Sequence, residues 1–84
     1  MIDMQDKEGY TLLALAVHYG RVEMVEVLLK NGADPNKATY VFKDTPLHMA
    51  VYFRFKKIQD LLLEAGADEN AMNAKGLIPW EGMA

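Results

Sequence analysis

One segment of this chain occurs twice. Residues 28–36 read LLKNGADPN and residues 62–70 read LLEAGADEN, so Gly32 and Gly66 stand 34 positions apart in a chain of 84 residues. A period of this length is typical of stacked supersecondary units, which cannot bury their apolar faces alone. A third copy begins at Gly76, so the sequence predicts a solenoid of two complete units and the start of another.

Each complete unit is expected to contain two short helices. The spacing of apolar residues places them at about 12–19 and 22–31 in the first unit, and at about 46–53 and 56–65 in the second. In the first unit, the buried face of the second helix is expected to consist of Met24, Val25, Leu28 and Leu29. The segments that join the units are too short for a helix and suit a hairpin-like turn.

Particular residues mark where these helices begin and end. Thr45 is a suitable N-cap, and Pro46 fits the first helical position, where its missing N–H costs nothing. His48 stands where its imidazole can reach back to the cap, as the Glu of a capping box does. Gly32 and Gly66 follow the second helices and are expected to end them with a positive φ.

These motifs resemble the ankyrin repeat. Residues 45–50 read TPLHMA and fit the Thr-Pro-Leu-His-x-Ala signature at every fixed position. Residues 6–11 resemble the turn before that signature, residues 20–29 the inter-helix turn and second helix, and residues 32–36 the closing turn. The resemblance implies an all-α ankyrin-repeat solenoid of stacked helix-turn-helix units, each with a short β-hairpin-like finger projecting from its base.

The resemblance also implies how the chain is divided. We expect one ankyrin-repeat domain over residues 1–84, with repeat 1 at about 3–35, repeat 2 at about 36–69 and a partial repeat 3 at about 70–84. Repeat 2 departs from the family pattern. Arg54 replaces the Gly between its helices, which leaves open a continuous helix and a domain-swapped form. Gln59 replaces an apolar residue and is expected to face the uncovered C-terminal side. The finger before Thr45 holds an inserted residue and lacks the family's Gly, so we expect it to be distorted.

By resemblance, the chain is a non-catalytic module that binds another protein through its fingertips and the concave face of its first helices. Six aromatic residues fall at these positions, although the repeat does not need them for its core. The alternative for these aromatics is that some fold back into the groove between repeats. The matching positions are Lys7, Glu8, Tyr10, His18, Tyr19, Tyr40, Val41, Phe42, Lys43, Asp44, Tyr52, Phe53, Met72, Ala74, Lys75 and Leu77.

The sequence also bears on two other classes of function. The chain can instead be a structural segment of a longer ankyrin array, with neighbouring repeats or self-association completing it. An enzyme is not expected, because the sequence lacks a nucleophile with its base, a phosphate-binding loop and a metal-ligand cluster. His48 is expected to be structural, and no cofactor or metal is implied.

Composition narrows the partners further. A net charge of −3 does not suit nucleic-acid binding, which requires excess cations. No apolar run approaches the roughly 18 residues of a membrane span, and the acidic N-terminus does not resemble a signal peptide. The chain has no cysteine. We therefore expect an intracellular, cytoplasmic protein, with export of a longer parent left open.

Overall fold

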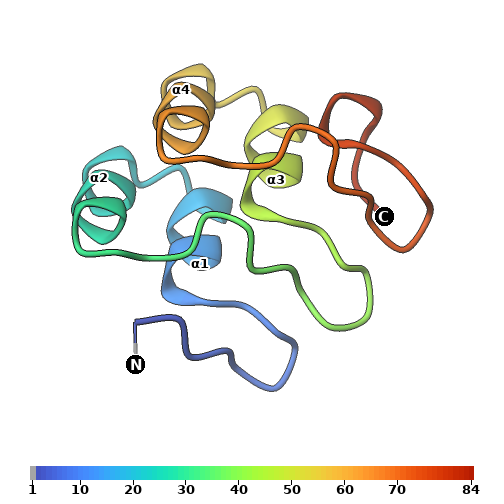
Figure 1. Cartoon of the computed structure of the whole chain (residues 1–84), viewed down its shortest axis with the longest axis horizontal. Coiled ribbons are helices and arrows are strands. Elements are labelled where there is room, and N and C mark those ends of the chain that lie inside the picture. The colour runs from blue at the N-terminus through green and yellow to red at the C-terminus, as the bar shows by residue number, and fades with distance from the viewer. Residues whose placement is uncertain (1) are drawn as a thin grey trace.

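A computed structural model describes residues 2–84 of the chain, which contain four α-helices and one 3-10 turn but no strand. The elements are α1 (Leu12–His18), α2 (Val22–Lys30), α3 (Pro46–Tyr52), α4 (Lys56–Glu64) and η1 (Pro79–Glu81). α1 packs against α2, and α3 packs against α4, while α1 also lies beside α3 and α2 beside α4 (Figure 1). The first helices therefore form one layer and the second helices another, which confirms the predicted all-α solenoid of stacked helix pairs.

Each helix ends one residue earlier than predicted. The last predicted residue serves as the C-cap, as at Tyr19 and Phe53, whose amides donate to the carbonyls of Leu15 and Met49. The third copy does not form a first helix within residues 2–84. It forms only η1, which packs against α3.

The predicted cap of α3 is present. The Thr45 amide donates to His48 Nδ1 at 3.1 Å, and the His48 amide donates to Thr45 Oγ1 at 3.3 Å. Since Nδ1 accepts, Nε2 carries the proton and donates to the Leu77 carbonyl at 2.8 Å. His48 thus ties repeat 2 to the following segment, and its predicted structural role is confirmed. Thr11 caps α1 in the same way, by accepting from the Ala14 amide at 3.0 Å.

The turn between α3 and α4 interrupts the helix, so the continuous-helix alternative is wrong for this structure. Arg54 adopts φ 62°, close to the 68° of Gly20 at the equivalent position of repeat 1. The Arg54 amide donates to the Val51 carbonyl, and the Phe55 amide donates to the Ala50 carbonyl, as in a helix C-terminal turn. Arg54 therefore holds a left-handed conformation that normally favours glycine.

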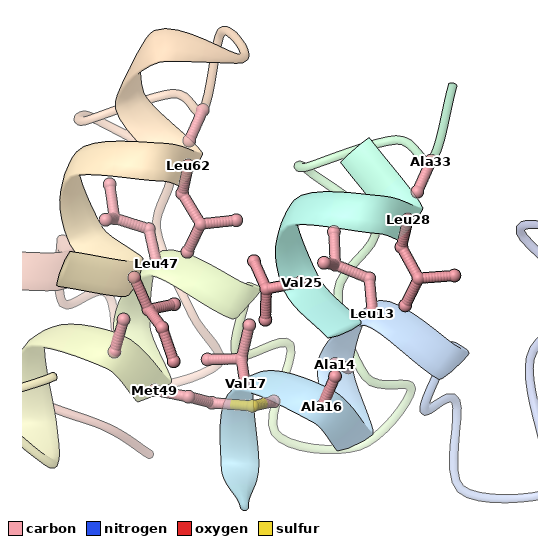
Figure 2. Close-up of a cluster of buried hydrophobic side chains, with 13 residues drawn as sticks. Leu13, Ala14, Ala16, Val17, Val25, Leu28, Ala33, Leu47, Met49 and Leu62 are labelled. Carbon is pink, nitrogen blue, oxygen red and sulfur yellow. The ribbon is translucent and has the colours of Figure 1, made fainter. Parts of the chain in front are cut away.

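A continuous apolar core joins the two helix pairs. Leu13, Val17 and Val25 of repeat 1 and Leu47 and Met49 of repeat 2 are all fully or almost fully buried. Figure 2 shows Met49 extending from α3 toward α1, where its side chain lies near Val17. Neither helix pair encloses this core alone, as the repeat pattern predicts.

Two predictions about burial are wrong. Met24 is 53% exposed because it points to the N-terminal side of repeat 1, whereas its equivalent in repeat 2, Ile58, is buried between the repeats. Gln59 is buried on α4 rather than exposed. The direction in which the repeats stack decides the exposure of Met24, whereas Gln59 occupies the position equivalent to Val25, which is also buried.

Polar side chains connect the closing turns of successive repeats. Asn36 Oδ1 accepts from the Asp68 amide at 2.7 Å, and Asn36 Nδ2 donates to the Gly66 carbonyl at 3.2 Å. One repeat earlier, Asp3 Oδ1 accepts from the Asp34 amide at 2.8 Å. The recurring Gly-Ala-Asp turn is therefore held by a side chain from the preceding unit.

Candidate functional site

Three finger loops project from the base of the helix pairs (Figure 1). A backbone hydrogen bond closes each loop: the Asp6 amide donates to the Tyr10 carbonyl at 2.9 Å, the Thr39 amide to the Asp44 carbonyl at 3.1 Å, and the Asn73 amide to the Leu77 carbonyl at 3.0 Å. In fingers 1 and 3 the amides of Gly9 and Gly76 also donate back to the carbonyls of Asp6 and Asn73, both at 2.9 Å. In the first and third fingers, the Asp6 and Asn73 side chains also accept from two amides of their own loop. The loops are therefore folded by their own polar residues, without a regular strand in the described part of the chain.

Backbone contacts hold the three fingers beside one another. The Tyr40 amide donates to the Glu8 carbonyl at 3.1 Å, and the Ala74 amide donates to the Phe42 carbonyl at 2.8 Å. A Cβ on Gly9 would lie 2.5 Å from the Tyr40 nitrogen, so glycine is required for the close approach of fingers 1 and 2. The fingertips therefore form one edge rather than three independent loops.

The second finger is the longest, because it holds the extra residue of repeat 2. It runs from Thr39 to Asp44, the two residues that close it, and Lys43 adopts φ 56° to complete the turn. Its tip presents Tyr40, Val41 and Phe42 to solvent, and Val41 is 73% exposed. The distortion expected for this finger is thus an enlarged loop with an apolar tip.

Aromatic rings extend from the base of finger 1 across the ends of α1 and α3. The His18 ring lies edge-to-face against Tyr10, Tyr19 and Phe53, with centroids 6.2, 5.1 and 5.2 Å away, and Phe53 in turn contacts Tyr52 at 5.3 Å. We call these five residues the aromatic strip. Tyr19 is 66% exposed and Tyr52 is 60% exposed. The strip is continuous across both repeats, yet its outer rings contribute little to the core.

His18 is the central member of the strip. Its Nδ1 atom is buried and has no hydrogen-bond partner within the described residues. Tyr10 lies half-buried beside it, and burial is the main cause that raises the pKa of the Tyr10 phenol, with the neighbouring charge of Glu8 adding to the effect. The phenol therefore stays neutral at physiological pH and can act as a hydrogen-bond donor.

The structure places the predicted site residues in three groups. Tyr10, His18 and Leu77 are half-buried, and Asp44 is buried. The rest are exposed on the fingers or at the ends of the first helices: Lys7, Glu8, Tyr19, Tyr40, Val41, Phe42, Lys43, Tyr52, Phe53, Met72, Ala74 and Lys75.

Asp44 requires a correction, because it does not lie on the exposed fingertip. Its carboxylate accepts from Asn73 Nδ2 at 2.9 Å and from the Ala84 amide at 3.0 Å. Its amide donates to Thr39 Oγ1 at 3.2 Å. Because the finger insertion lies before Asp44, this residue stays at the base of the loop, where it anchors the C-terminal segment instead of facing a partner.

One aromatic residue outside the predicted site supports the strip. The ring centroids of Phe55 and Phe53 are 5.7 Å apart. A Cβ placed on Gly20 would lie 3.1 Å from the Phe55 Cζ atom. In the sequence, Phe55 stands among basic residues, in the segment RFKK at 54–57. Its alignment with Arg21 of repeat 1 gives no hint of this contact. Phe55 fills the space above the inter-helix turn of repeat 1 and backs the exposed ring of Phe53.

Comparison with known proteins agrees with this architecture. The sequence profile described as "Ankyrin repeats (3 copies)" matches residues 1–73. The chain belongs to the ankyrin-repeat family. Human Rabankyrin-5 is 36% identical over 89 residues, which cover 93% of this chain and 8% of the relative. Alpha-latrotoxin-Lg1a from Latrodectus geometricus is 36% identical over 64 residues, covering 76% of this chain and 5% of the relative.

The E3 ubiquitin-protein ligase Ufd4 from Drosophila melanogaster is 36% identical over 80 residues, which are 95% of this chain but 3% of the ligase. The ankyrin chain therefore spans less than a tenth of each of these relatives. Ankyrin repeats are in general non-catalytic protein-interaction modules. No helix in residues 2–84 has the length and apolar character needed to cross a membrane. No group of three metal-ligating side chains is present in that range either.

Proposed function

We propose that this ankyrin chain binds another protein through the aromatic strip and the edge of fingertips beside it. The observation that carries the proposal is the strip itself. Its rings touch one another across two repeats, while Tyr19 and Tyr52 keep most of their surface in solvent. Exposed aromatic groups of this size are uncommon on a surface without a partner, and they are the residues that most often anchor interfaces.

Geometry supports the strip as a binding surface. Each ring rests edge-to-face against a neighbour, so its rotamer freedom is already restricted before a partner arrives. A partner that covers these rings therefore gains their apolar area at a small cost in side-chain entropy. His18 at the centre buries its Nδ1 atom without a hydrogen-bond partner among the described residues, so the strip presents mainly apolar ring surface to a partner.

The fingertips add a charge preference. Finger 1 exposes Asp6 and Glu8 beside Lys7, whereas the exposed charge of finger 2 is Lys43 and that of finger 3 is Lys75. Fingers 2 and 3 are thus locally basic, although the whole chain carries a net charge of −3. We infer that the partner places an apolar patch on the aromatic strip and acidic groups beside fingers 2 and 3, since complementary charges orient an encounter more than they tighten it.

The test is capture of protein partners from the native source, identified by mass spectrometry, with Tyr19, Tyr52 and Phe53 changed together to Ala. We expect partners captured by the natural chain to be lost, because truncation of anchor residues costs about 2 kcal/mol or more each. A second variant changes only Tyr52 and Phe53, so that an effect specific to Tyr19 is separated.

A matched control replaces three exposed residues of the second helices, Lys30, Lys57 and Glu64, by Ala. This control should retain every partner. All variants should keep the helical circular dichroism and the melting temperature of the natural chain within a few degrees, because the replaced side chains lie largely outside the core. Undiminished capture by the triple aromatic variant would contradict this location of the site.

A second candidate is a structural segment of a longer ankyrin array without a binding role of its own. It is favoured by the small share of each relative that the chain matches, 8% for Rabankyrin-5. The two candidates differ in the same capture experiment. If the chain is a purely structural segment, the natural chain should capture no more of any protein than the triple aromatic variant does.

A further inference from the structure

A polar groove lies among the segments that lead into the three fingers, which stand side by side (Figure 1). The groove has a volume of about 420 Å³, and we call it the basic groove. Its lining consists of Gln5, residues 36–40, Lys43, Thr45 and residues 71–72. Parts of all three repeat units therefore line it, so it is not a face left open by an end of the chain.

The charge of the basic groove has one sign. Among the described residues, the charged groups that line it are Lys37 and Lys43, and no Asp or Glu lines it, although the chain carries a net charge of −3. Lys37 is half-buried and Lys43 is exposed, and neither forms an ion pair within residues 2–84. An ammonium group that is partly removed from water gains more from a nearby anion than a fully solvated one does. The groove therefore favours a group with negative charge.

Lys43 lines this groove against the preference of its backbone. In each finger the residue before the closing residue has a positive φ, which is 94° at Gly9, 56° at Lys43 and 75° at Gly76. Fingers 1 and 3 hold glycine there, which adopts this conformation without strain, whereas a side chain with a Cβ costs free energy. Strain of this kind clusters at functional positions. The ammonium of Lys43 is what a glycine at this position could not supply.

A buried hydroxyl adds a hydrogen-bond donor to the two ammonium groups. Thr39 lines the groove and is only 5% exposed. Its Oγ1 atom accepts from the Asp44 amide at 3.2 Å, but the hydroxyl proton has no acceptor within residues 2–84. A hydroxyl carries one donor besides its acceptor sites, so Thr39 can still donate to an oxygen of a ligand.

Side-chain hydrogen bonds hold the groove in shape before a ligand arrives. Gln5 Nε2 donates to the carbonyls of Gly9 and Ala38, both at 2.9 Å, and so joins finger 1 to the segment before finger 2. Asn36, which also lines the groove, is held by the closing turn of repeat 2. A preformed groove spares a ligand part of the cost of ordering the protein.

We propose that the basic groove binds an extended protein segment that carries carboxylate side chains. Lys37 and Lys43 pair with the carboxylates, and Thr39 donates to one of their oxygens. The exposed side chains of Tyr40 and Met72 contact the apolar stems of the bound acidic residues. Two lysines are too few to hold a nucleic-acid backbone, which requires many phosphate contacts.

This inference rests on the charge preference in the proposed function and deepens it. It names the groove and the lysines that receive the acidic groups of the partner. No member of the aromatic strip lines the basic groove, so the two sites can be tested separately.

The test uses a fluorescein-labelled hexaglutamate peptide, which its own charges keep extended. Binding is measured by fluorescence polarisation at low ionic strength. The net charge of −3 repels this peptide from the chain as a whole, so binding reports a local cationic site. We expect the natural chain to bind hexaglutamate but not hexaglutamine, with an affinity that falls as salt is added. Inorganic phosphate at the same ionic strength should not displace the peptide.

Two substitutions remove the charges of the groove. Lys37→Gln and Lys43→Gly should each weaken peptide binding about threefold or more, and about tenfold or more together. Lys43→Gly also relieves the strain at a positive φ, so this variant should melt no lower than the natural chain. Lost binding in a protein of undiminished stability cannot then be ascribed to misfolding.

A matched control combines Lys30→Gln with Lys57→Gln. Both lysines are exposed on the second helices and lie outside the groove, and the control changes the net charge as much as the double groove variant does. It should keep the affinity of the natural chain for hexaglutamate. Equal losses in the two double variants would overturn the proposal, because binding would then depend on net charge alone.

Two further results would overturn the proposal: a natural chain that does not bind hexaglutamate at low ionic strength, and displacement of the peptide by inorganic phosphate, which indicates a site for small anions. The variant with Tyr19, Tyr52 and Phe53 changed to Ala should bind hexaglutamate as the natural chain does. Failure of the aromatic strip as the partner site would leave that binding intact, whereas failure of the groove would leave the strip-dependent capture intact.

Discussion

Arg54 is one of two non-glycine residues, with Lys43, that hold a left-handed backbone conformation within residues 2–84. At φ 62° a side chain with a Cβ costs roughly 1–2 kcal/mol relative to a right-handed conformation. Replacing it by Gly removes that strain but adds roughly 0.5–1 kcal/mol of unfolded-state entropy. The net prediction for Arg54→Gly is a stabilisation of roughly 0.5–1 kcal/mol, and therefore a melting temperature higher by about 2–8 °C for a domain of this size.

Two comparison variants isolate the backbone term. Arg54→Ala removes the charge but keeps the Cβ, so it should melt within about 2 °C of the natural chain. Gly20→Ala at the equivalent turn of repeat 1 should lower stability by about 1–2 kcal/mol. It introduces the same strain, and its Cβ would stand 3.1 Å from the Phe55 ring.

The assay is thermal and urea unfolding followed by circular dichroism, with every variant at one protein concentration so that self-association does not contribute. The result that refutes the reasoning is Arg54→Gly melting at or below the natural chain. An equal gain from Arg54→Ala would also refute it, because the gain would then come from the lost side chain rather than from the backbone.

Three further predictions concern the fingers and turns. Gly9→Ala should lower stability by about 2–4 kcal/mol through a backbone clash, whereas Gly32→Ala, at a similar φ but with open space around it, should cost only about 1 kcal/mol; urea unfolding measures both. Asn36→Ala should cost about 1–2 kcal/mol in the same assay, because it removes two hydrogen bonds between repeats. Because folding raises the pKa of Tyr10, the neutral phenol contributes its whole stabilisation of the folded state below pH 10. This contribution is lost as the pH rises through the pKa of Tyr10 in the folded state. Melting curves above pH 10 should therefore fall less steeply for Tyr10→Phe; parallel curves would contradict this.

Local sequence rules predicted the elements well because their causes are local. Thr45 and Pro46 start α3, and Gly32 follows α2, for reasons contained within a few residues. The same rules placed each helix end one residue too late. The final residue of each predicted helix acts as the C-cap before a left-handed residue, and that distinction depends on backbone geometry rather than on residue type.

Burial was predicted less well because it depends on neighbours. Met24 and Ile58 occupy equivalent positions of the two repeats, but Met24 is exposed and Ile58 is buried. Asp44 was assigned to the fingertip by alignment, but the inserted residue precedes it, so the carboxylate lies under the loop where it accepts from Asn73 and Ala84. The period of a repeat identifies which residues are equivalent. Whether a neighbouring unit covers each of them depends on the position of its own unit within the stack.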